Sequence, residues 1–361
     1  GGDLNLKPHG VEEGGEHDTT SPNPEPRSYL ANGDVPRTLA TPPHYAYLKV
    51  AEGCRKRCSF CIIPKIKGRL RSKPVDQVVQ EFNALLSCGA KEIMLIAQDL
   101  GDYGKDLRQP RSEVEQWRPG QSQLAPLLRS MLDSSDEDFW LRLMYLYPDE
   151  ITDDIVEVIR DDKRVCRYLD MPIQHVNNEI LKGMKRLTTG DDIRRTVNKL
   201  REELPGVHIR TSLMVGFPGE TDEQFYELLD FVREARLENV GAFAYSDEDM
   251  AISSRLSGKV PEEVKQQRLD MLMETQLEVV RDLNRERVVA RDRLDVVVEG
   301  CHPELEGIFM GRYYGQCPEV DGQVIINDVG NLENDPLPGK RYKVELTDFD
   351  DYDLVGRIVA Q

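Results

Sequence analysis

No run of apolar residues in the sequence is long enough to cross a membrane, and the first residues lack the basic and apolar stretches of a secretion signal. We therefore expect a cytoplasmic protein without a membrane span. Basic charge is scarce as well, because 47 Lys and Arg residues face 65 Asp and Glu residues and the net charge is −18. This balance argues against a protein that grips nucleic acid phosphates and suits a basic partner, although acidity also serves solubility alone.

The cysteine pattern is not that of a disulfide framework. The chain has seven cysteines, an odd number, of which three are crowded together and four are isolated at Cys88, Cys166, Cys301 and Cys317. Crowded thiols without an export signal indicate a reducing compartment and the ligation of a metal or cluster. We interpret the isolated cysteines as packing or surface thiols.

Residues 1–43 are rich in Gly, Pro, Ser, Thr and charge and have no apolar period, so we predict a disordered or loosely attached lead-in. From His44 onward, short apolar runs alternate with stretches of helical period. The runs that predict strands are 45–50, 92–97, 140–147, 168–173, 209–217 and 240–246. The segments that predict helices are 74–88, 122–133, 150–161, 176–203 and 221–237. Six strands that alternate with helices indicate an α/β fold of parallel βα units, either a partial (βα)6 barrel or an open doubly wound sheet.

The pattern changes near the end of the chain. Residues 260–289 carry apolar residues every three or four positions and predict one long amphipathic helix. Residues 290–361 switch to a period of two, with five short runs separated by turn residues, which predicts a small all-β barrel. We therefore expect two domains, 44–289 and 290–361.

The three crowded cysteines follow the first predicted strand in the segment AEGCRKRCSFCIIP, as Cys54, Cys58 and Cys61. A structural zinc site normally takes four protein ligands in two close pairs, and the sequence has no second pair. A 4Fe-4S cluster held by three thiolates leaves one iron without a protein ligand, and a cofactor or substrate can coordinate there. The spacing therefore favours an iron-sulfur cluster with an open iron.

With Phe60 before the third cysteine, this segment resembles the signature of the radical S-adenosylmethionine superfamily. The resemblance implies that the open iron binds the amino and carboxylate groups of S-adenosylmethionine (SAM). It also implies that an electron from the cluster splits the cofactor to a 5′-deoxyadenosyl radical, which abstracts hydrogen from an unactivated C–H bond. Such chemistry is expected at the mouth of the partial barrel, where the strands end.

The likeness extends over residues 44–361 and is most similar to the RimO class, the ribosomal protein methylthiotransferases. The segments that carry it are HYAYLKVAEGC, CSFCIIPKIKGRLRSKP, KEIMLIAQDLGDYGKD, MPIQHVNNEILKGMKR, MVGFPGETDEQFYELLDFV, VGAFAYSDED, VPEEVKQQR and GRYYGQCPEVDG. The resemblance implies that the terminal barrel is a TRAM domain, which is OB-like. It further implies that a methylthio group is placed on the β-carbon of one aspartate of ribosomal protein S12, with a separate electron donor for the cluster.

Two alternatives remain open. One is methylthiolation of an adenosine in tRNA, as in the MiaB-like relatives, and the other is a non-catalytic protein that binds zinc and RNA. Residues 290–361 contain seven basic and fifteen acidic residues, a net charge of −8. A domain that meets tRNA phosphates is expected to be basic, so the charge favours a basic protein substrate.

Further candidate cofactor-binding residues follow the predicted strands. Gln98 and Asp99 lie where the superfamily contacts the amino end of the cofactor, and ordinary loop residues are the alternative. Gly216 and Glu220 belong to a turn that either approaches the ribose and adenine or is purely structural. Arg142 and Arg210 stand inside apolar strands and need an acidic partner, which is either a cofactor carboxylate or a structural acid.

The chain also departs from the resemblance. Methylthiotransferases carry a further N-terminal domain whose three cysteines hold a second 4Fe-4S cluster implicated in sulfur delivery, and residues 1–43 contain no cysteine. We therefore expect a chain that lacks this domain and its cluster. The segment YSDEDMAISSRL also differs from the usual Glu-Gly-Thr-like continuation. His175 is expected to be a hydrogen-bonded structural residue rather than a proton-transfer group.

Overall fold

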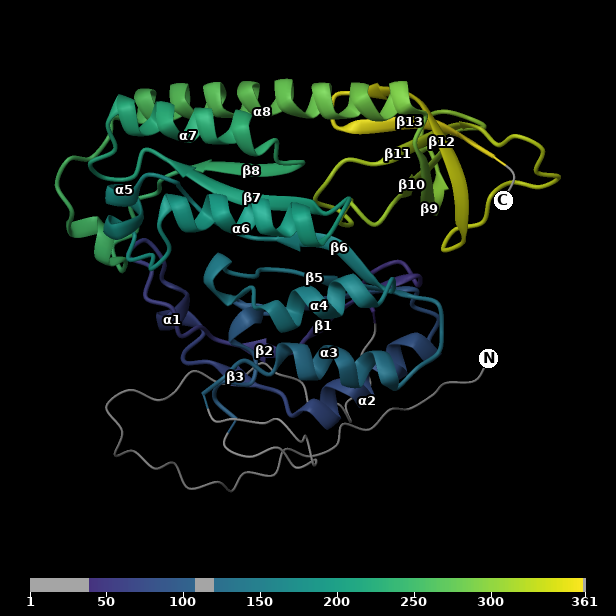
Figure 1. Ribbon diagram of the computed structural model, residues 1–361, viewed down its shortest axis with the longest axis horizontal. Helices are drawn as coiled ribbons and strands as arrows, with labels where there is room; N and C mark the ends of the chain where they lie inside the picture. The colour runs from purple at the N-terminus through teal and green to yellow at the C-terminus, as the bar shows by residue number, and fades with distance from the viewer. Residues whose placement is uncertain (1–38, 108–119, 360–361) are drawn as a thin grey trace, which may run out of the picture.

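The computed structural model describes residues 39–107 and 120–359, so residues 1–38 of the predicted lead-in lie outside the described part. A parallel sheet with covering helices forms one body, and a small barrel forms the other. One long helix runs along both of them (Figure 1). In the described ranges, no helix is long and apolar enough to cross a membrane.

The large body is built on six parallel strands in the order β1-β4-β5-β6-β7-β8, with β1 and β8 at the two edges. This confirms the partial (βα)6 barrel. The strands are β1 (Tyr45–Lys49), β4 (Glu92–Ile96), β5 (Trp140–Leu143), β6 (Val165–Asp170), β7 (His208–Val215) and β8 (Asn239–Ala244). The short strands β2 (Ala51–Glu52) and β3 (Arg71–Ser72) pair with each other in an antiparallel fashion.

The helices that follow the strands are α1 (Ile63–Ile66), α2 (Val75–Ser87), α3 (Leu124–Asp133), α4 (Asp153–Asp161), α5 (Asn178–Gly183), α6 (Gly190–Glu203) and α7 (Asp222–Ala235). Three 3-10 turns are η1 (Leu100–Asp102), η2 (Pro148–Glu150) and η3 (Ile252–Arg255). The single helix predicted at 176–203 is wrong, because the structure has two helices there. Lys185 adopts a left-handed φ of 59° after α5, and Thr189 begins α6 with a capping box to Asp192.

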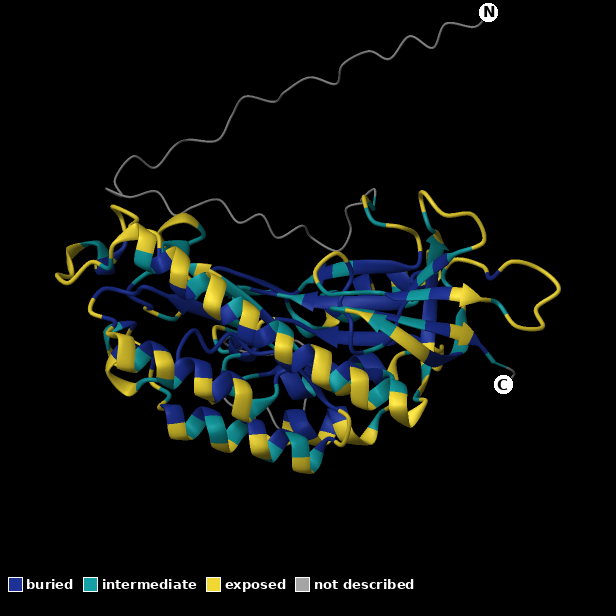
Figure 2. Ribbon diagram, turned by 90° about the horizontal axis from the view of Figure 1, so that it is seen from above, coloured by how far each residue is buried: buried dark blue, intermediate teal, exposed yellow. Residues whose placement is uncertain are grey.

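The main core lies between the sheet and these helices, where apolar side chains are almost fully buried (Figure 2). Strand alternation places Ala46 and Leu48 of β1 in this core, while Tyr45 faces the other side of the sheet and bonds to Glu319 of the small barrel. Phe82 of α2 meets Phe139 edge to face at a centroid distance of 5.1 Å. Burial of this one face therefore holds the helices against the sheet.

The long helix α8 (Glu262–Ala290) packs against β7, β8 and α7 and then reaches the small barrel. The small barrel consists of β9 (Arg293–Cys301), β10 (Phe309–Arg312), β11 (Val324–Asp328), β12 (Arg341–Asp350) and β13 (Asp353–Ile358). It is closed in the order β10-β11-β13-β12-β9 and has an apolar core of its own. The predicted five-stranded barrel is confirmed.

The small barrel is docked where the strands of the sheet begin. Arg341 lies over the ring of Trp140, the first residue of β5, at 4.6 Å. The Tyr313 hydroxyl lies 2.7 Å from Nε2 of His208, the first residue of β7. The opposite end of the sheet, where the strands finish, is therefore left to the loops that carry the cysteines.

Candidate active site

The three cysteines lie in the loop between β2 and β3, directly after the first strand of the sheet. Cys58 is buried, Cys54 and Cys61 are half-buried, and all three thiols are free. Gly53 begins the loop with a φ of +78°, and a Cβ at this position would lie 2.2 Å from the carbonyl oxygen of Arg69. The pairing of β2 with β3 therefore requires glycine just before the first cysteine.

The donor set fits an iron-sulfur cluster with three protein ligands. Burial raises the pKa of the Cys54 thiol to about 12, and the pKa of the Cys61 thiol is also raised by burial. The backbone N–H of Cys61 donates to the carbonyl of Cys58 at 3.2 Å, so the second and third cysteines lie on one tight turn of the loop. Cys166 and Cys317 belong to a separate buried cluster with Trp140 and Met144, and Cys88 and Cys301 are exposed at the ends of α2 and β9, so nothing among the described residues indicates a four-cysteine zinc site.

Phe60 anchors the cysteine loop to the ends of other strands. Its ring packs against the buried cluster formed by Ile180, Met184, Met214, Phe217 and Tyr245. A backbone hydrogen bond joins the same loop to the end of α5, because the N–H of Ser59 donates to the Met184 carbonyl at 3.0 Å. The loop is thus held in place by contacts that do not involve the thiols.

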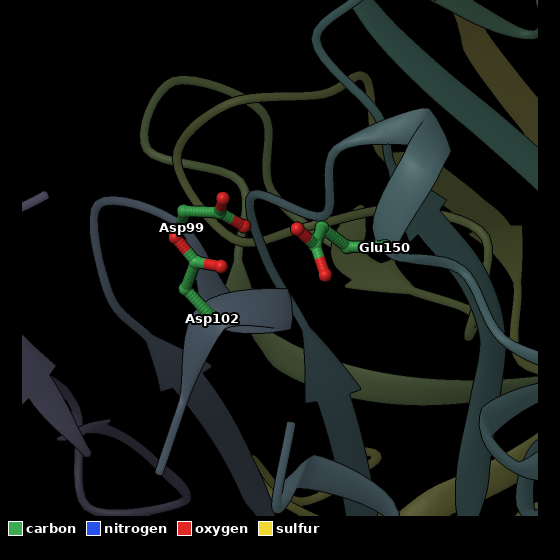
Figure 3. Close-up of side chains that lie close together, drawn as sticks. All are labelled: Asp99, Asp102 and Glu150. Carbon is green, nitrogen blue, oxygen red and sulfur yellow. The ribbon is translucent and has the colours of Figure 1, made fainter. Parts of the chain in front are cut away.

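A compact acidic group lies beside the cysteine loop. The carboxylates of Asp99, Asp102 and Glu150 point toward one another (Figure 3), with oxygen atoms within 4.8 Å. Lys56 contacts Glu150 at 2.6 Å and Asp99 at 3.4 Å, and Lys105 contacts Asp102 at 2.7 Å. Burial raises the pKa of Asp99 to about 7, and Lys56 opposes this shift. Two ammonium groups therefore balance much of this charge without a metal ion.

Of the two residues predicted from the sequence after β4, Asp99 lies next to the cysteine loop, 3.4 Å from Lys56, and Gln98 directly precedes it. The Oε1 atom of Gln98 is buried and has no hydrogen-bond partner among the described residues. Such an orphaned acceptor favours a ligand that donates a hydrogen bond, because a buried polar atom without a partner is costly. The contact of these residues with the amino end of the cofactor stays a prediction.

The Gly216–Glu220 turn is stabilised by contacts within the chain. Glu220 accepts the backbone N–H of Gly216 at 2.7 Å and is paired with Arg268 of α8 at 2.9 Å. Burial raises the pKa of Glu220 to about 7, while Arg268 lowers it. Gly216 has a φ of +72°, and a Cβ there would lie 2.3 Å from the side chain of Lys265. These contacts are those expected if the turn has a purely structural role.

His175 lies near the same turn and is fully buried. Its Nδ1 accepts the backbone N–H groups of Val176 and Asn177, each at 2.9 Å. Burial lowers the pKa of His175 to about 3, so the ring is neutral. Its contacts are those of a hydrogen-bonded structural residue.

Both predicted arginines have acidic partners within the protein. Arg142 is fully buried and its Nε donates to Glu92 at 2.7 Å, while Nη1 donates to the carbonyl of Tyr314 in the small barrel. Arg210 bonds to Asp170 at 2.8 Å. The sequence left two kinds of partner open, a cofactor carboxylate or an acidic side chain of the protein. In the structure, acidic side chains of the protein pair with both arginines.

Comparison with known proteins identifies the family. Residues 48–232 match the model of the Radical SAM superfamily, and residues 292–359 match that of the TRAM domain. The ribosomal protein uS12 methylthiotransferase RimO of Protochlamydia amoebophila is 53% identical over 92% of this chain and 67% of its own length. The chain belongs to the RimO family. The RimO protein of Chlamydia caviae is 46% identical over 93% of this chain and 70% of its own length.

Membership of the radical SAM superfamily implies a 4Fe-4S cluster and SAM for this RimO-family chain. Among solved structures, the coproporphyrinogen III oxidase HemN of Escherichia coli is 16% identical with a TM-score of 0.48, over 76% of this chain and 68% of that chain. That likeness is too distant to bear on the site.

Sequence reasoning missed several residues that surround the cysteines in this RimO-family chain. Tyr147 follows β5, and its hydroxyl lies 3.5 Å from the Sγ atom of Cys58. Lys56 and Arg186 lie over the Tyr147 ring at 4.9 Å and 4.1 Å. One sequence signal could have indicated Tyr147. It follows a buried strand, and active sites of such folds lie at the C-terminal ends of the strands. Arg186 comes from a distant segment and had no such signal.

Proposed function

We propose that this protein transfers a methylthio group to the β-carbon of an aspartate in ribosomal protein uS12. Two observations support this proposal. The chain belongs to the RimO family, and Cys54, Cys58 and Cys61 lie in one loop at the C-terminal end of the sheet strands. In this proposal the three cysteines ligate the cluster. When bound, the cluster and SAM supply the electron transfer and the radical that abstracts hydrogen.

The residues of the chain itself bind and orient. We assign the amino end of the cofactor to Gln98 and Asp99, each of which has a buried acceptor atom without a hydrogen-bond partner among the described residues. Phe60 positions that loop through its apolar contacts. The Gly216–Glu220 turn lies near the ribose and adenine in this proposal. Arg142 and Arg210 have a structural role in this proposal. Each is paired with an acidic side chain and helps to join the two proposed domains, 44–289 and 290–361.

The proposed partner is basic, and the TRAM domain supports this. Five of the seven basic side chains in residues 290–361 are in ion pairs with carboxylates, which lowers the positive potential that this surface offers to phosphates: Arg293, Arg312, Arg341, Lys343 and Arg357. The surplus of acidic residues then favours a basic ribosomal protein. In this proposal the enzyme works in the cytoplasm, where its substrate is made, and takes electrons for the cluster from a separate donor.

The sulfur atom needs a source beyond these residues. We propose a second cluster bound by cysteines other than the seven of this chain. Three of the seven belong to the proposed radical cluster, and Cys166 and Cys317 are buried beside Met144 and Trp140. One SAM molecule would donate the methyl group and another the radical.

The direct test is anaerobic reconstitution with iron and sulfide, followed by assay of 5′-deoxyadenosine formation from SAM with a uS12 peptide or with tRNA. We expect cofactor cleavage and preferential binding of the uS12 peptide. Binding of tRNA that strengthens steeply as salt is lowered, in preference to the peptide, would establish the MiaB-like alternative. Zinc without labile sulfide would contradict the enzyme and support the zinc- and RNA-binding alternative.

A further inference from the structure

Tyr147 occupies an unusual position for a tyrosine outside the set of cluster ligands. Its hydroxyl oxygen lies 3.5 Å from the Sγ atom of Cys58, the most buried of the three cysteines. It follows β5 directly before Pro148, which begins η2. The ring of proline clashes with the preceding residue in the helical conformation and restricts that residue to extended conformations, and Tyr147 has φ −68° and ψ 146°. Its place beside the cysteine is therefore set by the backbone.

The Tyr147 ring is also held by two cations. Lys56, from the cysteine loop itself, lies 4.9 Å from the ring centroid, and the Arg186 guanidinium lies 4.1 Å from it. Arg186 is buried and donates to the carbonyl of Pro172 at 3.1 Å. Cation–π contacts of this kind are worth about 0.5–2 kcal/mol each. The ring therefore has little freedom to turn its hydroxyl away from the sulfur.

Lys56 is held in turn by the acidic group of Figure 3. Its ammonium contacts two acids of this group, Glu150 at 2.6 Å and Asp99 at 3.4 Å, and also Asp149 at 3.6 Å. Lys56, which lies between the first and second cysteines, thus links the cysteine loop to the loops after β4 and β5. This arrangement gives the acidic group a role that needs no metal ion: it fixes the cation that lies over Tyr147.

The direction of the contact with Cys58 follows from the chemistry of an iron ligand. A cysteine that ligates iron is a thiolate and has no proton to donate. A tyrosine hydroxyl has an ordinary pKa of about 10, so it carries a proton at neutral pH and can donate it. The tyrosine is then the donor and the ligand sulfur is the acceptor.

We propose that Tyr147 is a positioning residue of the cluster, whose hydroxyl donates a hydrogen bond to the ligand sulfur of Cys58 and raises the reduction potential of the cluster. Reduction adds negative charge that is shared by the sulfur atoms, so a hydrogen bond to sulfur stabilises the reduced state more than the oxidised state. The inference rests on the proposed function, because it requires that the three cysteines hold the cluster.

The test is the midpoint potential of the reconstituted protein, measured by titration with dithionite and followed by the electron paramagnetic resonance of the reduced cluster. Tyr147→Phe keeps the ring and its cation contacts and removes only the hydroxyl. We expect the reduction equilibrium to become less favourable by about tenfold, which for one electron is about 59 mV toward negative potential. The matched control, Tyr145→Phe, removes an exposed hydroxyl two residues earlier and should leave the potential unchanged.

A second variant keeps the test decisive if Tyr147→Phe loses its cluster. Replacement of Tyr147 by a fluorinated tyrosine retains the fold and strengthens the hydroxyl as a donor, so the potential should move in the positive direction. An unchanged potential in the fluorinated variant, at the iron and sulfide content of the parent, would overturn the inference and leave the proposed function intact, whether or not Tyr147→Phe keeps its cluster. A parent protein that binds zinc and forms no cluster would instead overturn the proposed function itself.

Discussion

Single residues around the cysteine loop show how closely local backbone geometry and the proposed site are linked. Gly53 precedes the first cysteine in a left-handed conformation and faces the carbonyl of Arg69 across the β2–β3 pair. Any side chain there meets backbone atoms, which cannot move without opening the loop. The loop therefore tolerates glycine alone at this position.

Replacement of Gly53 by alanine tests this constraint. We expect Gly53→Ala to lose most of its reconstituted iron and sulfide, because the Cβ would lie 2.2 Å from the Arg69 oxygen and the loop must shift. The left-handed backbone alone costs about 1 kcal/mol. Gly89→Ala is the matched control, since Gly89 also has a positive φ but nothing lies within 4 Å of its Cβ position. Full cluster content in Gly53→Ala would contradict the prediction.

At the scale of secondary structure, the start of α7 near the site is stabilised by a side-chain cap. Thr221 accepts the backbone N–H of Gln224 at 3.3 Å, and the Gln224 side chain accepts the backbone N–H of Thr221 at 3.0 Å. This capping box begins α7 directly after Glu220. The cap thus links the stability of α7 to the position of the Gly216–Glu220 turn.

Thr221→Ala should lower the free energy of unfolding by about 1 kcal/mol, because an N–H at the start of α7 loses its acceptor. Chemical denaturation of the anaerobically prepared protein measures this change. Thr221→Ser retains the hydroxyl and should recover most of the loss. If alanine and serine at this position gave the same stability as threonine, the cap would not contribute to folding.

At the scale of the whole molecule, the TRAM domain and α8 meet the sheet at a buried histidine. His208 Nε2 lies 2.7 Å from the Tyr313 hydroxyl and 2.6 Å from Arg287 Nη2 of α8. Burial, with the charge of Arg287, lowers the pKa of His208 well below 6.5. The junction between the two bodies therefore requires a neutral imidazole.

This requirement gives a pH dependence with a definite sign. Because the folded pKa of His208 is below the unfolded value of about 6.5, the unfolded chain takes up a proton first as the pH falls. The stabilisation is complete above pH 6.5 and decreases below it, by up to about 1.4 kcal/mol per pH unit for this one group. Denaturation between pH 7 and 5 should show a smaller slope in His208→Gln than in the parent.

His302→Gln is the control for this slope, because His302 lies on the TRAM domain away from the junction and accepts the backbone N–H groups of Glu304 and Leu305. It should leave the pH dependence unchanged. His175 is a second buried neutral histidine and contributes a separate slope in every variant. An identical slope in His208→Gln and the parent would show that the junction does not control acid stability.

The elements were largely predictable because their signals are local. Apolar runs marked the six strands of the sheet, and the change of period after residue 290 marked the small barrel. The break between α5 and α6 was not predicted, because Lys185 supplies its left-handed turn without the glycine that usually marks such a turn. Strand β6 begins at Val165, three residues before the predicted start, because helical and strand residues mix at that boundary.

The sequence by itself determined the cysteine triad, the alternation of strands and helices, and the family, because spacing and period are properties of neighbouring residues. Only the tertiary structure decided which side chains meet. Arg142 and Glu92 are fifty residues apart yet pair in adjacent strands, and Tyr147 and Arg186 reach the cysteine loop from separate segments. Such contacts depend on strand order and docking, which no local pattern records, so the residues that surround the proposed cluster emerged only from the fold.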